Sequence, residues 1–123
     1  MNEDISFKVL KDQGLIVWNI SGAEISIFCQ NINQAIISSD KNTIFVLTGE
    51  ETYPNILEGY NLKGNKIFKT YAPENFTFYY LSDQGEKGTS VVCIGENLIN
   101  GWQDWRFLIN EKTGGLKRYC PAR

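Results

Sequence analysis

The chain has 123 residues, a formal net charge of −2 and shares of apolar (42%) and charged (21%) residues that are ordinary for one globular domain. Its lysines are scattered singly, whereas a nucleic-acid binder would gather basic residues into a stripe. It contains no histidine, which removes the side chain most used for proton transfer near neutral pH and argues against many hydrolase and nuclease mechanisms.

The N-terminal segment predicts a cytoplasmic protein. Residues 1–4 are acidic where a secretory signal would be basic, and no apolar run or small-residue cleavage site follows them. No later window approaches the roughly 18 consecutive apolar residues of a transmembrane helix. We therefore expect neither secretion nor a membrane partner.

Strand signals dominate the first forty residues. Residues 5–10 and 15–20 are rich in β-branched and aromatic residues, and the Asp-Gln-Gly sequence at 12–14 between them predicts a hairpin. Residues 24–29 alternate between charged or small side chains and apolar ones, which indicates a strand with one buried face. Another strand is expected at residues 34–38.

A buried strand, an acidic loop and a hairpin are expected next. Residues 44–47 (IFVL) are apolar on both faces, which is typical of a central strand that is packed on each side. The loop GEETYP follows at residues 49–54. Two strands, at residues 55–61 and 66–71, then flank a compact turn that contains Gly64.

The C-terminal half repeats this pattern. A strand at residues 76–82 precedes residues 90–94 (SVVCI), which are again apolar on both faces. Residues 105–109 and 116–119 form the last hairpin, around a glycine-containing turn at 110–115. No segment shows a convincing helical period, so the chain is predicted to be all-β and antiparallel.

Three hairpins of the sequence can be laid over one another. Each has an asparagine at the end of its first strand, then a turn glycine, then an aliphatic residue that leads the second strand. The three sets are Asn19, Gly22 and Ile25; Asn61, Gly64 and Ile67; and Asn110, Gly114 and Leu116. The glycines are forty-two and fifty residues apart, in or near the range of four-stranded propeller blades.

On these hairpins the chain resembles β-propeller blades of the quinoprotein and WD-repeat type, although no Trp-Asp dipeptide or tryptophan-docking signature is present. The resemblance implies about two and a half four-stranded repeats in a single all-β domain (1–123), with units at 1–33, 34–73 and 74–123. A β-sandwich or barrel is the alternative fold. Two and a half blades cannot close a ring of the usual four to eight, so the outer faces must be capped, packed on each other or used in self-association.

If the sheets are blades, alternate loops gather at one end of the molecule, and that end is acidic. Exposed tyrosine and tryptophan among like charges suit the interface with an oppositely charged protein. A solvated rim whose aromatic rings pack into the core is the other interpretation. The predicted partner-binding residues are Glu50, Glu51, Tyr53, Glu74, Glu96, Trp102, Asp104 and Trp105, with Asp12 in a neighbouring loop of the same end.

Catalytic and cofactor motifs are missing from the sequence. Glu50 and Glu51 are adjacent on an extended loop, where neighbouring side chains point apart, so general acid-base work by this pair is not expected. Neither a Walker loop nor a Gly-x-Gly-x-x-Gly sequence precedes a helix. The three cysteines are far apart and lack Cys-x-x-Cys spacing, which predicts buried thiols without a disulfide framework or a metal site. We expect no enzymatic activity and no cofactor.

A small, acidic, histidine-free β protein without catalytic motifs is similar in character to the immunity proteins of bacterial contact-dependent inhibition and other polymorphic toxin systems. That resemblance implies binding to a cognate toxin domain, often a basic nuclease, whose cleft the acidic end would fill. Two alternatives stay open. One is a structural protein that assembles with copies of itself through blade faces, and the other is a carbohydrate or small-molecule binding module that uses Trp102 and Trp105 as stacking platforms.

Overall fold

The computed structural model describes residues 6–49, 52–83 and 88–122. In these residues the strands form three antiparallel sheets, each of which follows the chain order from strand to strand. Sheet A contains β1 (Phe7–Leu10), β2 (Leu15–Ile20) and β3 (Ala23–Phe28), with a short 3-10 turn, η1 (Lys11–Gln13), between β1 and β2. Sheet B contains β4 (Ile32–Ile37), β5 (Thr43–Thr48), β6 (Ile56–Asn61) and β7 (Lys66–Tyr71). Sheet C contains β8 (Phe76–Asp83), β9 (Thr89–Ile99), β10 (Trp102–Ile109) and β11 (Leu116–Pro121).

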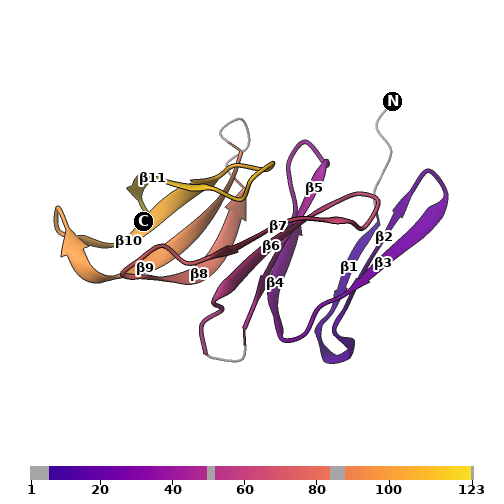
Figure 1. Ribbon diagram of the computed structural model, residues 1–123, viewed down its shortest axis with the longest axis horizontal. Coiled ribbons are helices and arrows are strands. Elements are labelled where there is room, and N and C mark those ends of the chain that lie inside the picture. The colour runs from indigo at the N-terminus through magenta and orange to yellow at the C-terminus, as the bar shows by residue number, and fades with distance from the viewer. Residues whose placement is uncertain (1–5, 50–51, 84–87, 123) are drawn as a thin grey trace.

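The all-β, antiparallel prediction is confirmed, and in the described parts of the chain none of the three sheets closes into a barrel. Figure 1 shows the sheets side by side, with sheet B between sheets A and C. Within the described ranges no helix is long and apolar enough to cross a membrane.

Sheet B is packed on both faces, and β5 shows how the sequence achieves this. Its side chains alternate in direction, as in any strand. Phe45 and Leu47 belong to the core between sheets B and C, whereas Ile44 and Val46 belong to the core between sheets A and B. All four are fully buried. The apolar run therefore forms the two-sided central strand that its composition predicted.

The hairpin turns of sheets B and C each pack on the preceding sheet. Gly64, in the turn between β6 and β7, lies against Ile25 of sheet A, and the Trp18 indole donates a hydrogen bond to the Leu62 carbonyl at 2.8 Å. Gly114, in the turn between β10 and β11, lies against Phe68 of sheet B. Each unit is thus joined to its predecessor by a turn as well as by a sheet face.

These two turns are also built in the same way. The side-chain oxygens of Asn61 and Asn110 each accept two backbone hydrogen bonds from their own turns. Gly22, Gly64 and Gly114 all have positive φ (82°, 90° and 77°), where glycine carries no steric penalty. The Gly22 turn differs in one respect, because a side chain at that position would meet no atom within 4 Å.

Sheet A is one strand shorter than the other two. Its β2–β3 hairpin corresponds to β6–β7 and β10–β11, so β1 occupies the place of β5 and β9, the second strands of their sheets. In sheets B and C a further strand, β4 or β8, pairs with that second strand from the other side. In the described residues β1 is paired with β2 alone.

Candidate functional site

The predicted acidic end is only partly described. Two of the predicted partner-binding residues, Glu50 and Glu51, lie outside the described residues. The prediction describes this end as acidic. Lys11 and Asp12, however, share the η1 turn and both are exposed, so this loop carries a balanced pair of charges.

Three of the predicted acidic residues come together where the strands of sheet C end. The Glu96 amide donates to the Asn75 carbonyl at 2.9 Å, which places exposed Glu96 beside the segment that carries exposed Glu74. Asp104, on the adjacent strand β10, is half-buried. This part of the acidic prediction therefore rests on Glu74 and Glu96.

The two predicted tryptophans have different environments. Trp102 is exposed at the start of β10, close to the β9–β10 turn. Trp105 is only 7% exposed, belongs to the core between sheets B and C, and donates from its indole to the Trp102 carbonyl at 3.1 Å. The Arg118 guanidinium covers its ring at 4.8 Å. Trp105 is therefore a core residue covered by a cation, because its inward position on β10 outweighs its place near a loop, and it offers no exposed ring to a partner.

Tyr53 is part of an exposed tyrosine cluster, which we define as Tyr53, Tyr79 and Tyr80. The Tyr53 and Tyr79 rings meet edge to face with centroids 5.9 Å apart, and Tyr79 and Tyr80 do so at 5.0 Å. The three side chains are 43%, 44% and 36% exposed. Edge-to-face pairs of this kind contribute about 0.5–1.5 kcal/mol beyond the area they bury, so the rings hold each other in place at the surface.

A β-bulge in β8 creates this cluster. Phe78 pairs with Cys93 and Tyr80 pairs with Val92, so Tyr79 is the extra residue between them. A bulge leaves one residue unpaired and turns its side chain away from the regular alternation. The adjacent tyrosines in FTFYYLS interrupt the period of two, and that interruption was the available sequence signal for an exposed site.

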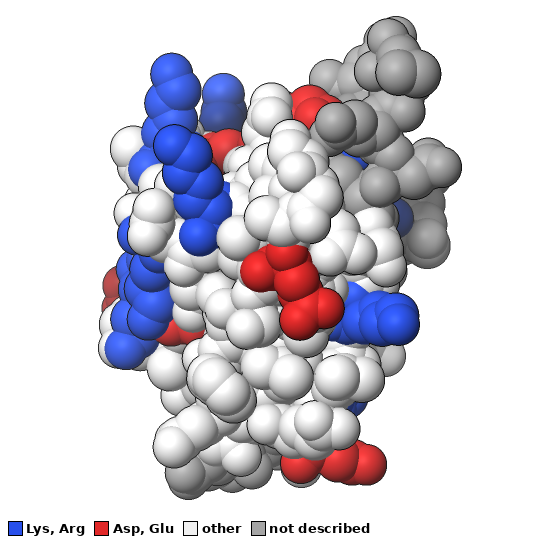
Figure 2. Space-filling model, turned by 90° about the vertical axis from the view of Figure 1, so that its right-hand side faces the viewer, with Lys and Arg blue, Asp and Glu red and all other residues white. Residues whose placement is uncertain are grey.

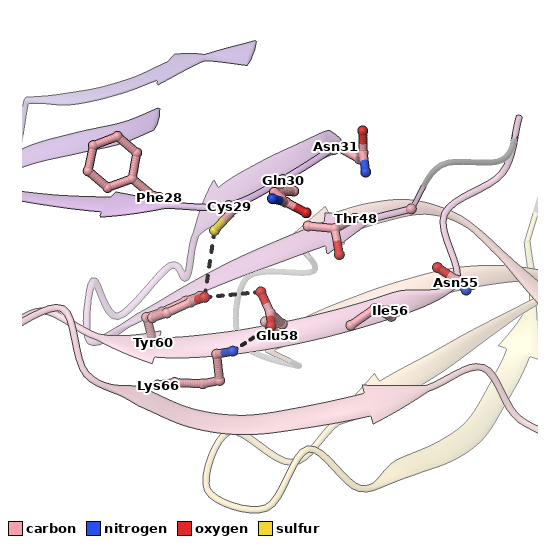
Figure 3. A pocket seen from close by; sticks show the side chains of 11 residues that line it. Phe28, Cys29, Gln30, Asn31, Thr48, Asn55, Ile56, Glu58, Tyr60 and Lys66 are labelled. Atoms are coloured by element: carbon pink, nitrogen blue, oxygen red, sulfur yellow. Dashed lines mark hydrogen bonds and ion pairs between the residues drawn. The ribbon is translucent and has the colours of Figure 1, made fainter. Parts of the chain in front are cut away.

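A separate cavity of about 480 Å³ lies between the end of β3 and the strands β5–β7 of sheet B (Figure 3). Four side chains at this cavity form a chain of polar contacts. The Tyr60 hydroxyl donates to Glu58 at 3.0 Å and lies 3.6 Å from the Cys29 sulfur, while the Lys66 ammonium pairs with the other Glu58 oxygen at 2.7 Å. Amide and hydroxyl side chains complete the polar wall, which includes Gln30, Asn31, Thr48 and Asn55.

The groups of this cavity satisfy one another. Both Glu58 oxygens are engaged, and burial raises the pKa of the Cys29 thiol and of the Tyr60 hydroxyl, so both stay protonated at neutral pH. A protonated thiol is a poor nucleophile. The arrangement stabilises the A–B interface and presents a polar lining, with no activated nucleophile. This chain of contacts could not be predicted from the sequence, because Cys29 and Tyr60 are 31 positions apart.

No protein-family model, curated protein or solved structure matched the chain. Fold alone does not define function, so a function must be argued from the surface and its chemistry.

Proposed function

We propose that the protein is a non-enzymatic, cytoplasmic protein-binding module, and specifically an immunity protein that binds and neutralises a basic, nuclease-type toxin domain. The observation that carries the proposal is the exposed tyrosine cluster. Tyrosine is among the residues enriched at binding hot spots, since it supplies a large rigid contact surface and a polar hydroxyl.

The conformational state of the cluster also supports binding. Its rings are ordered by each other in the free protein, so a partner would not need to immobilise three separate side chains, each at about 0.5–1.5 kcal/mol. On a stable monomer, scattered exposed aromatics need no explanation, whereas a contiguous set marks an interaction site.

Acidic residues near the same strand favour a positively charged partner. Glu74 lies five residues before Tyr79, about 16 Å along an extended chain, and Glu96 lies beside it at the end of sheet C. Carboxylates at this distance act through their long-range field, which steers a basic partner and raises its association rate at low salt. Glu50 and Glu51 precede Tyr53 by three and two positions in the sequence and are proposed to add to this field.

The test uses the purified protein and a basic, nuclease-type toxin domain, which the proposal expects to be encoded by the neighbouring reading frame. Tyr79→Ala is expected to weaken binding at least about tenfold, mainly through faster dissociation. Reversal of Glu50, Glu51, Glu74 and Glu96 to lysine is expected to slow association and to flatten its salt dependence, with loss of protection in cells.

Glu24→Lys is the matched control, because Glu24 is an exposed acidic residue on sheet A, outside the proposed surface. Binding and protection that survive both sets of substitutions, in variants that remain folded, would refute the proposal. If Glu24→Lys slows association as much as the reversals in the proposed surface do, the effect is one of total charge and not of that surface.

Self-association is the second candidate, and the outer face of sheet A favours it. One row across the three strands carries Leu10, Leu15 and Phe28 in direct register, and Phe28 is 81% exposed. Figure 2 looks onto this side of the molecule, where most of the surface is uncharged, an acidic side chain lies near the middle and most of the basic side chains gather along one flank. Light scattering of the protein and of Phe28→Asp over a wide concentration range distinguishes a stable oligomer from a monomer.

A further inference from the structure

The open edge of β1 has a defined hydrogen-bonding pattern. The Asn19 amide donates to the Ser6 carbonyl, so Ser6 and, by alternation, Lys8 and Leu10 direct their backbone groups toward β2. Phe7 and Val9 therefore direct their N–H and C=O groups away from the sheet. Their side chains pack against the core between sheets A and B. The edge thus combines outward backbone groups with an inward apolar face.

The third sheet shows what occupies this position elsewhere in the chain. There β8 pairs with β9, the counterpart of β1, and directs Phe78 and Leu81 into the core that faces sheet B. The Gln34 side chain of β4 fixes β8 from the neighbouring sheet, since it accepts from the Leu81 amide at 2.7 Å and donates to the Leu81 carbonyl at 3.4 Å. An inner strand is thus held both by its own sheet and by the next one.

Among the described residues, no strand pairs with β1 on the side away from β2. A groove of about 360 Å³ is lined by residues 9–13, at the end of β1 and along η1. On the side of β4 that faces sheet A, Ala35 and Ile37 remain only half-buried. On the other face of sheet B, the inner strand of sheet C, β8, contacts β4 and β5.

We infer that the edge of β1 is an acceptor site for an extended segment of a partner protein, which adds to sheet A as its fourth strand. Main-chain hydrogen bonds to Phe7 and Val9 supply affinity, and apolar side chains at alternate positions of the segment reach the core between sheets A and B. This is strand addition, a common mode of peptide recognition. The inference does not depend on the proposed function, because neither the tyrosine cluster nor the acidic residues take part in it.

A partner protein is a better source of the strand than a second copy of this chain. Every described strand already belongs to a sheet of its own chain, so a second copy could place one of them beside β1 only together with the whole sheet to which that strand belongs. The chemistry of the segment follows from β8, which occupies the corresponding position. It should be extended, free of proline and apolar at the positions that face the core, as Phe76, Phe78 and Leu81 are in β8.

The probe is a fluorescein-labelled peptide that copies residues 75–83, together with a version that carries aspartate in place of Phe78 and Leu81. The first should bind the full-length protein saturably, and the second should bind at least about tenfold more weakly. Val9→Pro removes an outward N–H while leaving the ladder to β2 intact, which an edge strand tolerates. Val9→Pro should weaken the binding of the first peptide by a similar factor.

Ser26→Pro is the matched control on the opposite edge of sheet A. In the β2–β3 ladder the Cys29 amide donates to Gly14, so Ser26, three positions before Cys29, directs its backbone outward as Val9 does. It should leave peptide affinity unchanged within about twofold. Equal losses in both variants, or no saturation up to about 1 mM peptide, would overturn the inference.

Amide hydrogen exchange tests the inference in the unaltered protein, in case Val9→Pro fails to fold. Bound peptide should slow the exchange of the Phe7 and Val9 amides at least about tenfold and leave the Ser26 amide unaffected. Binding without protection of Phe7 and Val9 would place the peptide elsewhere and refute the proposed site.

Discussion

Gly114→Ala tests whether the repeated turns hold neighbouring sheets together. A β-carbon at this position would lie 2.3 Å from the Thr70 hydroxyl oxygen and 2.4 Å from a Phe68 ring carbon, closer than real contacts allow. The positive φ of 77° adds strain for any residue with a β-carbon. Overpacking costs about 1–3 kcal/mol and left-handed backbone about 1–2 kcal/mol, so a loss of about 2–5 kcal/mol is expected.

Gly22→Ala is the matched control, because Gly22 has a similar φ of 82° and an added β-carbon meets nothing within 4 Å. It should lose only the backbone contribution of about 1–2 kcal/mol. The effect of alanine on the unfolded chain is shared by both variants and cancels in the comparison. The difference of about 1–3 kcal/mol therefore measures the packing of the turn on sheet B.

Urea unfolding followed by tryptophan fluorescence measures this difference. At a slope of about 2 kcal/mol/M, the midpoint of Gly114→Ala should lie about 0.5–1.5 M below that of Gly22→Ala. Midpoints that agree within about 0.2 M would refute the idea that the turn is a structural contact between units.

Three further variants test individual contacts. Trp18→Phe removes the 2.8 Å indole hydrogen bond to Leu62 and leaves that carbonyl without this donor, which should lower stability by about 1–3 kcal/mol in thermal unfolding. Lys66→Met removes the cation beside buried Glu58; because the Lys66 side chain is 47% exposed and screened by water, only about 1 kcal/mol should be lost in urea unfolding. Burial raises the pKa of Cys93 to about 12, so this thiol should resist maleimide at pH 8 while the protein stays folded.

Each of these expectations has a contradicting result. Unchanged thermal unfolding of Trp18→Phe would mean that water replaces the indole without loss. Lys63 is an exposed lysine in the neighbouring turn, so Lys63→Met is the control for Lys66→Met. Equal urea midpoints of the two variants would mean that the ion pair between Lys66 and Glu58 does not stabilise the fold. Rapid labelling of Cys93 in the folded protein would show that the B–C core opens readily.

The raised pKa of Cys93 also predicts a pH effect with a definite sign. The folded protein keeps the thiol protonated, whereas the unfolded chain ionises near its ordinary value of 9.0. The stabilisation is therefore complete below pH 9 and is lost as the pH rises from 9 toward 12. Cys93→Ala should show a shallower loss of stability in that window when followed by urea unfolding.

The sequence predicted those parts of the fold that depend on local chemistry. Side chains alternate between the two faces of a strand, so a run such as IFVL places apolar side chains on both faces. Such a strand is stable where each face is packed against another layer. The turn glycines are predictable for the same reason, since positive φ is a local requirement. The three aligned hairpins are therefore found at the expected places in the three sheets.

The candidate site was less accessible to sequence reasoning because it depends on contacts between sheets. Tyr79 meets Tyr53 only because a bulge redirects it toward a loop of sheet B. Trp105 lies near a loop in the sequence, yet its position on β10 turns it into the B–C core. Proximity to an acidic loop was thus a poor guide to which aromatic rings are exposed.

The way each turn packs on the preceding sheet has a consequence for how such a chain can grow. A unit needs only two features to dock: a sheet face that matches the next one and a glycine turn that reaches back to its predecessor. Both features lie within a single segment of forty to fifty residues. Duplication of one segment would therefore supply a new unit whose docking geometry is already encoded, so the length of the stack can change by gene duplication while existing interfaces keep their residues.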